Sequence, residues 1–208
     1  MTRGIKMVKQ PKSGIVAVLF SVVFLAILTS ENFLVAGQLQ VNLGSKKENH
    51  PVANFSLTDQ DGRPFHLTQL RGKVALLFFG YTSCPDACPT TLSKLSRVYK
   101  LLSDDKAKVV ILFVSVDPQR DTPSVLKNYL AYFHLNSIGL SGTKGQIDEV
   151  VSQYGAKYEI EQSDSAAGYH INHSTDLYLL DQKGELAGHF NYSDGQQIIV
   201  DGVRRLIH

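Results

Sequence analysis

Two almost uninterrupted apolar runs stand out in the middle of the chain, at residues 74–81 and 109–116. Runs of this length, rich in β-branched and aromatic residues, are typical of strands that are covered on both faces, as in parallel sheets. Between them, after a polar stretch at residues 82–91, apolar residues recur every three or four positions up to Leu102, which indicates a helix. The pattern therefore predicts a strand, a turn, a helix and a second strand parallel to the first.

The rest of the chain shows shorter patterns with recognisable ends. Thr122 followed by Pro123 fits the cap and first position of a helix, and Thr143 with Gln146 fits a capping box. Residues 156–172 show no periodicity, and we expect a long loop there of the kind that is usually functional. The other predicted elements are a hairpin of residues 55–58 and 64–67, helices at 123–133 and 144–154, a short strand at 138–140, paired strands at 176–180 and 186–190, and a last helix capped by Ser193.

This order of elements predicts the fold class α/β, with a thioredoxin-like mixed sheet flanked by helices and an added N-terminal β-hairpin. The first central strands would be parallel and joined by helical crossovers, and the last pair would be antiparallel. In open α/β sheets, functional groups collect at the edge where the parallel strands end. The polar stretch after residue 81 is expected to lie at this edge.

The N-terminal quarter of the chain has a different pattern. A basic tail is followed by a segment without Lys or Arg that is long enough to span a bilayer, which is typical of a membrane anchor with its amino end in the cytosol. A cleaved signal peptide is the alternative, although residues 35–37 resemble a cleavage site only partly. We expect a retained anchor in a bacterial inner membrane, with the globular domain on the periplasmic side. The predicted organisation is a cytoplasmic basic tail at 1–13, a transmembrane anchor or signal segment at 14–37, a linker at 38–50 and a thioredoxin-like domain at 51–208.

Charge and cysteine content narrow the possible functions. The chain has 21 Lys and Arg residues against 19 Asp and Glu, and four of the basic residues lie in the N-terminal tail. The globular part is thus close to neutral, which argues against a nucleic-acid partner. About 160 residues are enough to fold around a hydrophobic core without cross-links. The only two cysteines, Cys84 and Cys88, are therefore free for chemistry.

Cys84 and Cys88 are four residues apart across the predicted start of a helix. Helix geometry puts their α-carbons about 6 Å apart, inside the window of about 4.4–6.8 Å for a disulfide. The pair can close as a disulfide or offer two thiolates to one metal ion, and its three intervening residues make it wider than the pair of thioredoxin-type catalysts. A purely structural disulfide here would close too short a loop to stabilise the fold much. We expect the helix dipole to favour the thiolate of the cysteine nearer the helix.

Two thiolates form a soft site that selects Cu(I), zinc or an iron–sulfur cluster, and a histidine is the expected third ligand. Of the seven histidines, His170 and His173 lie just before a predicted strand. In thioredoxin-like folds the residue before this strand packs against the redox turn, and His173 holds the corresponding place. The other histidines are expected in strands, at a helix end, in the linker and at the terminus; they are His66, His189, His134, His50 and His208.

Three motifs occur in order along the chain: Cys-Pro-Asp-x-Cys-Pro at 84–89, Ser-Val-Asp-Pro-x-Arg-Asp-Thr at 115–122 and Asn-His-Ser at 172–174. With these motifs the chain, from about residue 54 to its end, resembles the SCO/SenC family of membrane-anchored, thioredoxin-fold copper proteins. The resemblance implies a site for copper, as Cu(I), Cu(II) or both, made of Cys84, Cys88 and His173. It also implies a role in assembling the dinuclear copper centre of cytochrome c oxidase, with oxidase subunit II and a copper donor protein as partners. The family usually has an acidic residue where this chain has Asn172.

Other functions use similar residues. The same thiols would suit a thiol–disulfide reductase that keeps the cysteines of the oxidase subunit reduced, so the protein is a metallochaperone, an enzyme or both. His173 separates the two functions, because a pure reductase does not need it. A peroxiredoxin is disfavoured, since the places of that family's proline and threonine before the reactive cysteine hold Tyr81 and Pro85. Asp86 and Asp117 are candidates for tuning the site from outside its ligands, with a place in a cap or turn as the alternative for each.

Overall fold

A computed structural model describes residues 54–164 and 168–208 of the chain. The basic tail, the anchor or signal segment and the linker, predicted at residues 1–50, lie outside the described residues. Among the helices of the described part, none is long and apolar enough to cross a membrane. The architecture that follows is that of the predicted globular domain.

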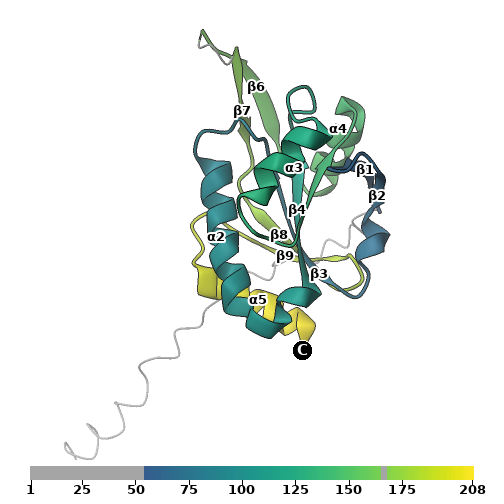
Figure 1. The fold of residues 1–208 in the computed structure, drawn as a ribbon, viewed down its shortest axis with the longest axis vertical. Helices are drawn as coiled ribbons and strands as arrows, with labels where there is room; N and C mark the ends of the chain where they lie inside the picture. The colour runs from purple at the N-terminus through teal and green to yellow at the C-terminus, as the bar shows by residue number, and fades with distance from the viewer. Residues whose placement is uncertain (1–53, 165–167) are drawn as a thin grey trace, which may run out of the picture. The chain divides into compact units, whose positions relative to one another are not determined.

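A seven-stranded mixed sheet forms the centre of this domain (Figure 1). β3 (Val74–Gly80) and β4 (Val109–Ser115) are parallel neighbours, and β5 (Ser137–Ser141) continues the parallel part. The strand order is β2-β1-β5-β4-β3-β8-β9. The antiparallel strands are β1 (Ser56–Asp59), β2 (Pro64–His66), β8 (Leu177–Leu180) and β9 (Leu186–Phe190). The predicted mixed sheet with an N-terminal hairpin is confirmed.

Helices cover both faces of the sheet. Three of them, α2 (Ala87–Leu102), α3 (Pro123–Ala131) and α5 (Gln196–Ile207), pack on one face. On the other face, α4 (Lys144–Gln153) and the 3-10 helix η1 (Leu67–Leu70) pack against apolar residues of the sheet. A second 3-10 helix, η2 (Ser103–Lys108), joins α2 to β4. Because alternate residues of a strand point to opposite faces, this double cover explains why β3 and β4 are apolar at almost every position and buried throughout.

Two helices begin at the predicted local signals. Thr122 caps α3, since its side-chain oxygen accepts a hydrogen bond from a backbone N–H of the first turn. Thr143 and Gln146 form the predicted capping box at α4. Each cap satisfies backbone donors that the helix itself leaves without a partner, so both starts are set by local sequence.

The start of the last helix differs from the prediction. Gly195, rather than Ser193, precedes the first residue of α5. The carboxylate of Asp194 accepts a hydrogen bond from the backbone N–H of Asn191 at 2.8 Å. This bond closes a turn, and the helix can begin only after it.

The largest difference from the prediction lies at residues 156–172, where we expected a loop without strands. The structure has β6 (Tyr158–Gln162) and β7 (Tyr169–His173), which pair antiparallel as a separate two-stranded sheet and project at the top of the domain in Figure 1. Most of β6 is exposed, and Ile171 is the buried residue of β7. Tyr158 and Ile160 in β6, and Tyr169 and Ile171 in β7, do alternate with polar residues, but each alternating stretch is only five residues long, and the prediction missed it.

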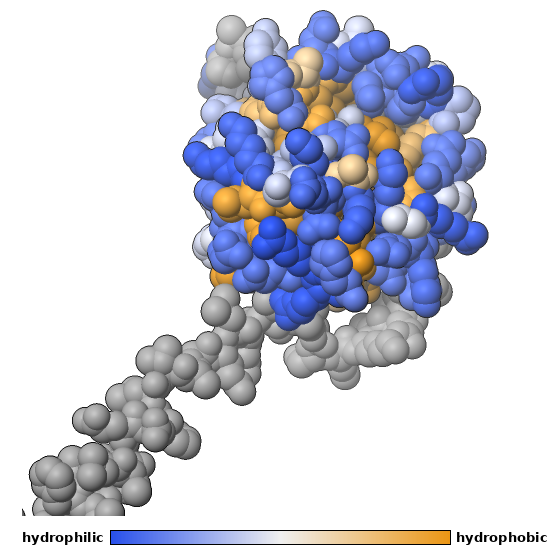
Figure 2. Space-filling model, turned by 60° about the horizontal axis from the view of Figure 1, so that its bottom comes forward, coloured by the Kyte–Doolittle hydropathy of each residue, from blue (hydrophilic) through white to orange (hydrophobic). Residues whose placement is uncertain are grey.

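The lower end of the domain is mostly hydrophilic, with separate apolar areas between the polar residues (Figure 2). Most large apolar side chains lie instead between the sheet and its covering helices. Residues that are almost fully buried there include Leu76, Leu77, Phe79, Ile111, Leu112 and Phe113. The stability of the domain is therefore expected to depend on the middle of the sheet.

Replacing Leu112 by Ala tests this expectation. Leu112 lies in the central strand β4 and is 0% exposed, so the change leaves a cavity that its neighbours fill only in part. The free energy of unfolding should fall by about 2–5 kcal/mol, measured by urea denaturation. The matched control is Leu101→Ala, at a position 47% exposed, which should change it by less than about 0.5 kcal/mol. Equal losses for the two variants would contradict the assignment of the core.

Candidate metal centre

Both cysteines lie where strand β3 is followed by a helix. β3 ends at Gly80 and α2 begins at Ala87, so Cys84 lies in the connecting turn and Cys88 in the first turn of the helix. Both thiols are free; Cys84 is half-buried and Cys88 is 1% exposed. The pair thus lies at the carboxyl end of a parallel strand, as predicted.

The third predicted ligand comes from a distant segment of the chain. His173 is the last residue of β7, and its Nε2 lies 3.5 Å from the Sγ of Cys88. The two sulfur atoms and a ring nitrogen of His173 all lie within 4.8 Å of one another. In the described part of the chain, this is the one group of three or more His, Cys, Asp and Glu residues that could hold a metal ion. The structure therefore brings together the three residues predicted from the sequence.

The hydrogen bond on the far side of the imidazole orients His173. Its Nδ1 lies 2.9 Å from the carbonyl oxygen of Ser174. A carbonyl oxygen accepts but cannot donate, so Nδ1 carries the proton of this bond. In its neutral form, the one that can bind a metal, the imidazole then has its lone pair on Nε2, on the side of the two sulfur atoms. This is the arrangement that a metal-binding histidine uses to fix its tautomer and ring orientation.

Two residues at the end of β3 shape the site without contributing a ligand. A Cβ atom at Gly80 would lie 2.7 Å from the Sγ of Cys88 and 2.9 Å from the ring of Phe113, so only glycine leaves room for this sulfur. The ring of Tyr81 packs edge-on against the imidazole of His173, with 5.8 Å between centroids. The Tyr81 hydroxyl also accepts a hydrogen bond from the backbone N–H of Ile171 at 3.3 Å. Neither residue was predicted, because packing roles have no sequence signal of their own.

The two thiols differ in acidity. A hydrogen bond from the Cys88 thiol, with further contributions from His173 and from the backbone N–H groups of Cys88 and Asp86, lowers the pKa of Cys84 to about 3. The hydrogen bond to Cys84 is the largest cause that raises the pKa of Cys88 well above its usual range, and burial of the thiol is the second. At neutral pH the reduced pair therefore holds one thiolate, on Cys84, and one proton, on Cys88.

This order of acidity is the reverse of the prediction, which favoured the thiolate on the cysteine nearer the helix. The backbone N–H groups at the start of α2 act on Cys84, because this residue lies in front of the first turn. Cys88 lies within that turn and is packed into the apolar cluster between α2 and the sheet, where a charge is poorly solvated. The start of α2 does stabilise a thiolate, but on Cys84 rather than on Cys88.

A family model described as SCO1/SenC matches residues 44–208. The chain belongs to the SCO1/SenC family. The family that the sequence motifs indicated is therefore confirmed.

Individual relatives of this SCO1/SenC protein cover the same part of the chain. An SCO2-like protein of Rickettsia prowazekii is 40% identical over 156 residues, which are 74% of this chain and 75% of the relative. The structure of Bradyrhizobium japonicum ScoI with copper bound is 37% identical, with a TM-score of 0.68, over 74% of this chain and 98% of that one. BsSco, described as a member of the Sco family of cytochrome c oxidase assembly proteins, is 25% identical, with a TM-score of 0.61, over 76% of this chain and 93% of that one.

The two aspartates proposed to tune the site lie outside its ligand cluster. Asp86 is exposed and accepts a hydrogen bond from the Thr90 hydroxyl at 3.2 Å. Asp117 is buried and accepts a hydrogen bond from the Tyr169 hydroxyl at 2.8 Å. Asp117 is also paired with Arg120. Neither carboxylate belongs to the cluster of Cys84, Cys88 and His173.

The neighbours of His173 on β7 point elsewhere. His170 is exposed and lies 2.9 Å from a carboxylate oxygen of Glu161. Asn172, which stands where the family usually has an acidic residue, donates its amide to the same carboxylate at 2.5 Å. The choice of His173 over His170 as the ligand candidate is therefore consistent with the geometry. His66 and His189 lie in β2 and β9, as predicted.

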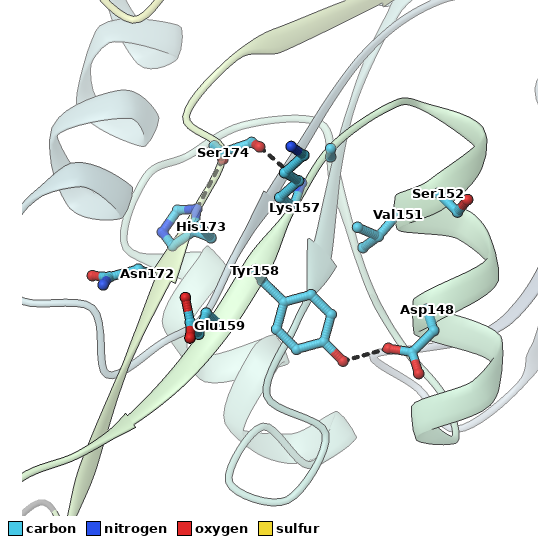
Figure 3. Close-up of a pocket in the computed structure, with 10 residues that line it drawn as sticks. Asp148, Val151, Ser152, Lys157, Tyr158, Glu159, Asn172, His173 and Ser174 are labelled. Carbon is cyan, nitrogen blue, oxygen red and sulfur yellow. Dashed lines mark hydrogen bonds between the residues drawn. The ribbon is translucent and has the colours of Figure 1, made fainter.

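A cleft of about 700 Å³ opens beside the site, between α4 and the base of the β6–β7 hairpin (Figure 3). His173 and Asn172 line it on one side, and Asp148 lines it on the other. The Tyr158 hydroxyl donates a hydrogen bond to Asp148 at 2.5 Å across it. His173 is thus one of the residues that line an accessible cleft.

The acidity of Cys84 predicts its alkylation behaviour. With a pKa of about 3, this thiol is already ionised at pH 5, so its rate of reaction with iodoacetamide should stay nearly constant between pH 5 and pH 8. An ordinary thiol, with a pKa of about 8.5, loses about tenfold in rate for each pH unit below that value. Peptide mapping of the reduced protein should find the label on Cys84 and not on the buried Cys88.

The matched control removes the hydrogen-bond donor. In a Cys88→Ala variant the strongest stabilisation of the Cys84 thiolate is lost, so its pKa should rise and its alkylation should become dependent on pH. A steep pH dependence in the wild-type protein as well would show that Cys84 is an ordinary thiol.

Proposed function

We propose that this protein binds copper through Cys84, Cys88 and His173 and delivers it during assembly of the dinuclear copper centre of cytochrome c oxidase. The observation that carries the proposal is the convergence of two sulfur atoms and one imidazole nitrogen within 4.8 Å. Copper is here a cargo that the protein takes up and passes on. The proposal therefore needs a site that both binds and releases.

The chemistry of the three donors suits copper. Thiolates are soft ligands that favour Cu(I), and an imidazole also suits Cu(II). Cys84 offers its thiolate at neutral pH, whereas binding at Cys88 has to displace the proton that its raised pKa retains. Because Cys84 is only half-buried, an incoming partner ligand has access to the ion. If an external two-electron oxidant converted the pair to a disulfide, two of the three donors would be lost and the ion would be released.

The relatives support the biological setting of this proposal. Copper is bound in the ScoI structure, and BsSco is described within a family of oxidase assembly proteins. We propose oxidase subunit II as the recipient of the copper and a separate copper donor protein as its source. The basic and apolar pattern of residues 1–37 supports a membrane anchor that places the domain on the periplasmic side of a bacterial inner membrane.

A thiol–disulfide reductase is the second candidate function. The acidity of the pair favours it, since an accessible thiolate of low pKa beside a protonated partner is what attacks a disulfide and then resolves the mixed disulfide. In this function Cys84 attacks a disulfide of the oxidase subunit, and Cys88 displaces the product thiol to form the Cys84–Cys88 disulfide. His173 contributes to the acidity of Cys84, after the larger contribution of Cys88, but takes no direct part in these steps.

Replacing His173 by Ala separates the two functions. Loss of a metal ligand should weaken Cu(I) binding by more than about 100-fold, measured by competition with a chelator of known affinity. Reduction of a disulfide peptide by the same variant should remain close to the wild-type rate. His170→Ala is the matched control, because this exposed histidine lies three residues away on the same hairpin, and it should leave copper affinity unchanged.

The outcomes of this experiment are distinct. Copper affinity that survives His173→Ala would overturn the three-ligand site. Wild-type protein that reduces the peptide but binds no copper would leave only the reductase function. Loss of copper binding in both histidine variants would show that the effect is not specific to His173.

Gly80→Ala tests the space around Cys88. The added methyl group would meet the Sγ of Cys88 at 2.7 Å and the buried Phe113 ring at 2.9 Å, so the sulfur has to move away from its place near His173. Copper affinity should fall by about tenfold, the effect expected when a ligand is misplaced rather than removed. The control is Gly145→Ala at the start of α4, where a Cβ meets no atom within 4 Å. Wild-type affinity in the folded Gly80→Ala protein would show that the sulfur does not need this position.

A further inference from the structure

The two halves of the metal centre come from segments that are far apart in the chain. Cys84 and Cys88 are held by the turn between β3 and α2, and His173 is held by the end of the β6–β7 hairpin. The hairpin is a separate two-stranded sheet, so the main-chain bonds of the seven-stranded sheet do not fix its position. Another set of contacts must set the distance between the sulfur atoms and the imidazole.

The loop between β4 and α3, residues 116–122, reaches the cysteine half of the site. Asp121 in this loop is fully buried. Its carboxylate accepts bonds from the backbone N–H and the hydroxyl of Thr82, at 3.0 and 2.5 Å, and from the Ser115 hydroxyl at 2.6 Å. Thr82 lies only two residues before Cys84. The loop thus holds the cysteine turn through a single buried carboxylate.

The same loop reaches the histidine half through Arg120. The guanidinium lies over the ring of Tyr169, with its central carbon 3.7 Å from the ring centroid. Its Nη1 donates a hydrogen bond to the carbonyl oxygen of Tyr169 at 3.1 Å. The Nε of Arg120 donates to Asp117, and the Tyr169 hydroxyl donates to the same carboxylate. Backbone, ring and hydroxyl of Tyr169 are therefore all held by residues of one loop.

Strand β7 connects Tyr169, which the loop fixes, to the metal ligand His173. Tyr169, Ile171 and His173 alternate along β7 and therefore face the same side of the hairpin. Ile171 is buried, and its N–H is bound by the hydroxyl of Tyr81. The ring of Tyr81 in turn lies 5.6 Å from the guanidinium carbon of Arg120 and 5.8 Å from the imidazole centroid of His173. Movement of the Tyr169 end of β7 would therefore shift His173 relative to the sulfur atoms.

We propose that Arg120 is a positioning residue of the metal centre: it holds β7 so that His173 stays within reach of Cys84 and Cys88. Asp121 fixes the cysteine turn and Arg120 fixes β7, so the β4–α3 loop sets the distance between the two halves of the site. The proposal rests on the copper site proposed above and adds a residue that contacts neither the ion nor its ligand atoms.

The chemistry of this position requires arginine. A guanidinium is planar and offers donors in fixed directions, so it can lie on a ring, bond a carbonyl and pair with a carboxylate at the same time. An ammonium group is a compact charge without a flat face, and it cannot make these three contacts together. Arg120→Lys therefore keeps the charge and loses the geometry.

The test compares Arg120→Lys with the wild type in the full chain. Copper affinity of the variant should fall by about tenfold, the size typical of losing a residue that orients a metal ligand. In the metal-free protein, hydrogen exchange at the Ile171 amide should become faster, because its bond to Tyr81 depends on the position of β7. Arg63→Lys is the matched control, since Arg63 pairs with Asp59 and Asp61 in the turn between β1 and β2. It should change neither measurement.

A double-mutant cycle separates positioning from general destabilisation. If Arg120 acts through His173, then Arg120→Lys should cause no further loss of copper affinity in a His173→Ala background. The same loss in both backgrounds would show that Arg120 acts on the sulfur atoms or on the fold, and would overturn the proposal. Wild-type affinity and wild-type amide exchange in Arg120→Lys would also overturn it. Failure of the copper site itself would appear differently, as wild-type protein that binds no copper. Exchange of the Ile171 amide would still show whether Arg120 fixes the position of β7.

Discussion

The approach of the His173 imidazole to the buried sulfur of Cys88 is the interaction on which the rest of the site depends. Cys84 and Cys88 are placed by local structure, since both belong to one strand–turn–helix unit. His173 comes from a hairpin outside the main sheet, and its Nε2 still lies 3.5 Å from the Cys88 sulfur. With this contact the site offers three donor atoms that could hold one metal ion. Without it, the same thiols form only a redox pair.

Several features of the fold serve this one contact. The absence of a side chain at Gly80 makes room for the Cys88 sulfur against the central strand. The carbonyl oxygen of Ser174 holds the proton side of the imidazole, so the lone pair of Nε2 is left for the sulfur side. Tyr81 and Arg120 keep the hairpin in place from the side of the sheet. The metal ligands are thus a small part of a larger arrangement that determines where they lie.

The sequence predicted those parts of the molecule that depend on local pattern. The apolar runs of β3 and β4, the cap at Thr122 and the capping box at Thr143 are set by neighbouring residues, and they were predicted correctly. The β6–β7 hairpin was missed although Tyr158 and Ile160, and Tyr169 and Ile171, alternate with polar residues, because each alternating stretch is only five residues long. The sequence prediction took Cys88 as the more acidic thiol, whereas Cys84 is. The burial of Cys88 and its hydrogen bond to Cys84 depend on tertiary packing, which the sequence pattern does not show. Gly80, Tyr81 and the Arg120–Tyr169 contact were missed for the same reason, because they become apparent only when distant segments meet.

X-ray absorption spectroscopy of the reduced full-length protein loaded with one equivalent of Cu(I) tests the central claim most directly, because it counts the atoms around the ion. The account predicts two sulfur neighbours and one nitrogen neighbour, with the outer-shell scattering of an imidazole ring. The imidazole signal should disappear in the His173→Ala protein. A wild-type spectrum with sulfur neighbours alone would contradict the account, because it would show that the ion is held by the cysteines without the histidine.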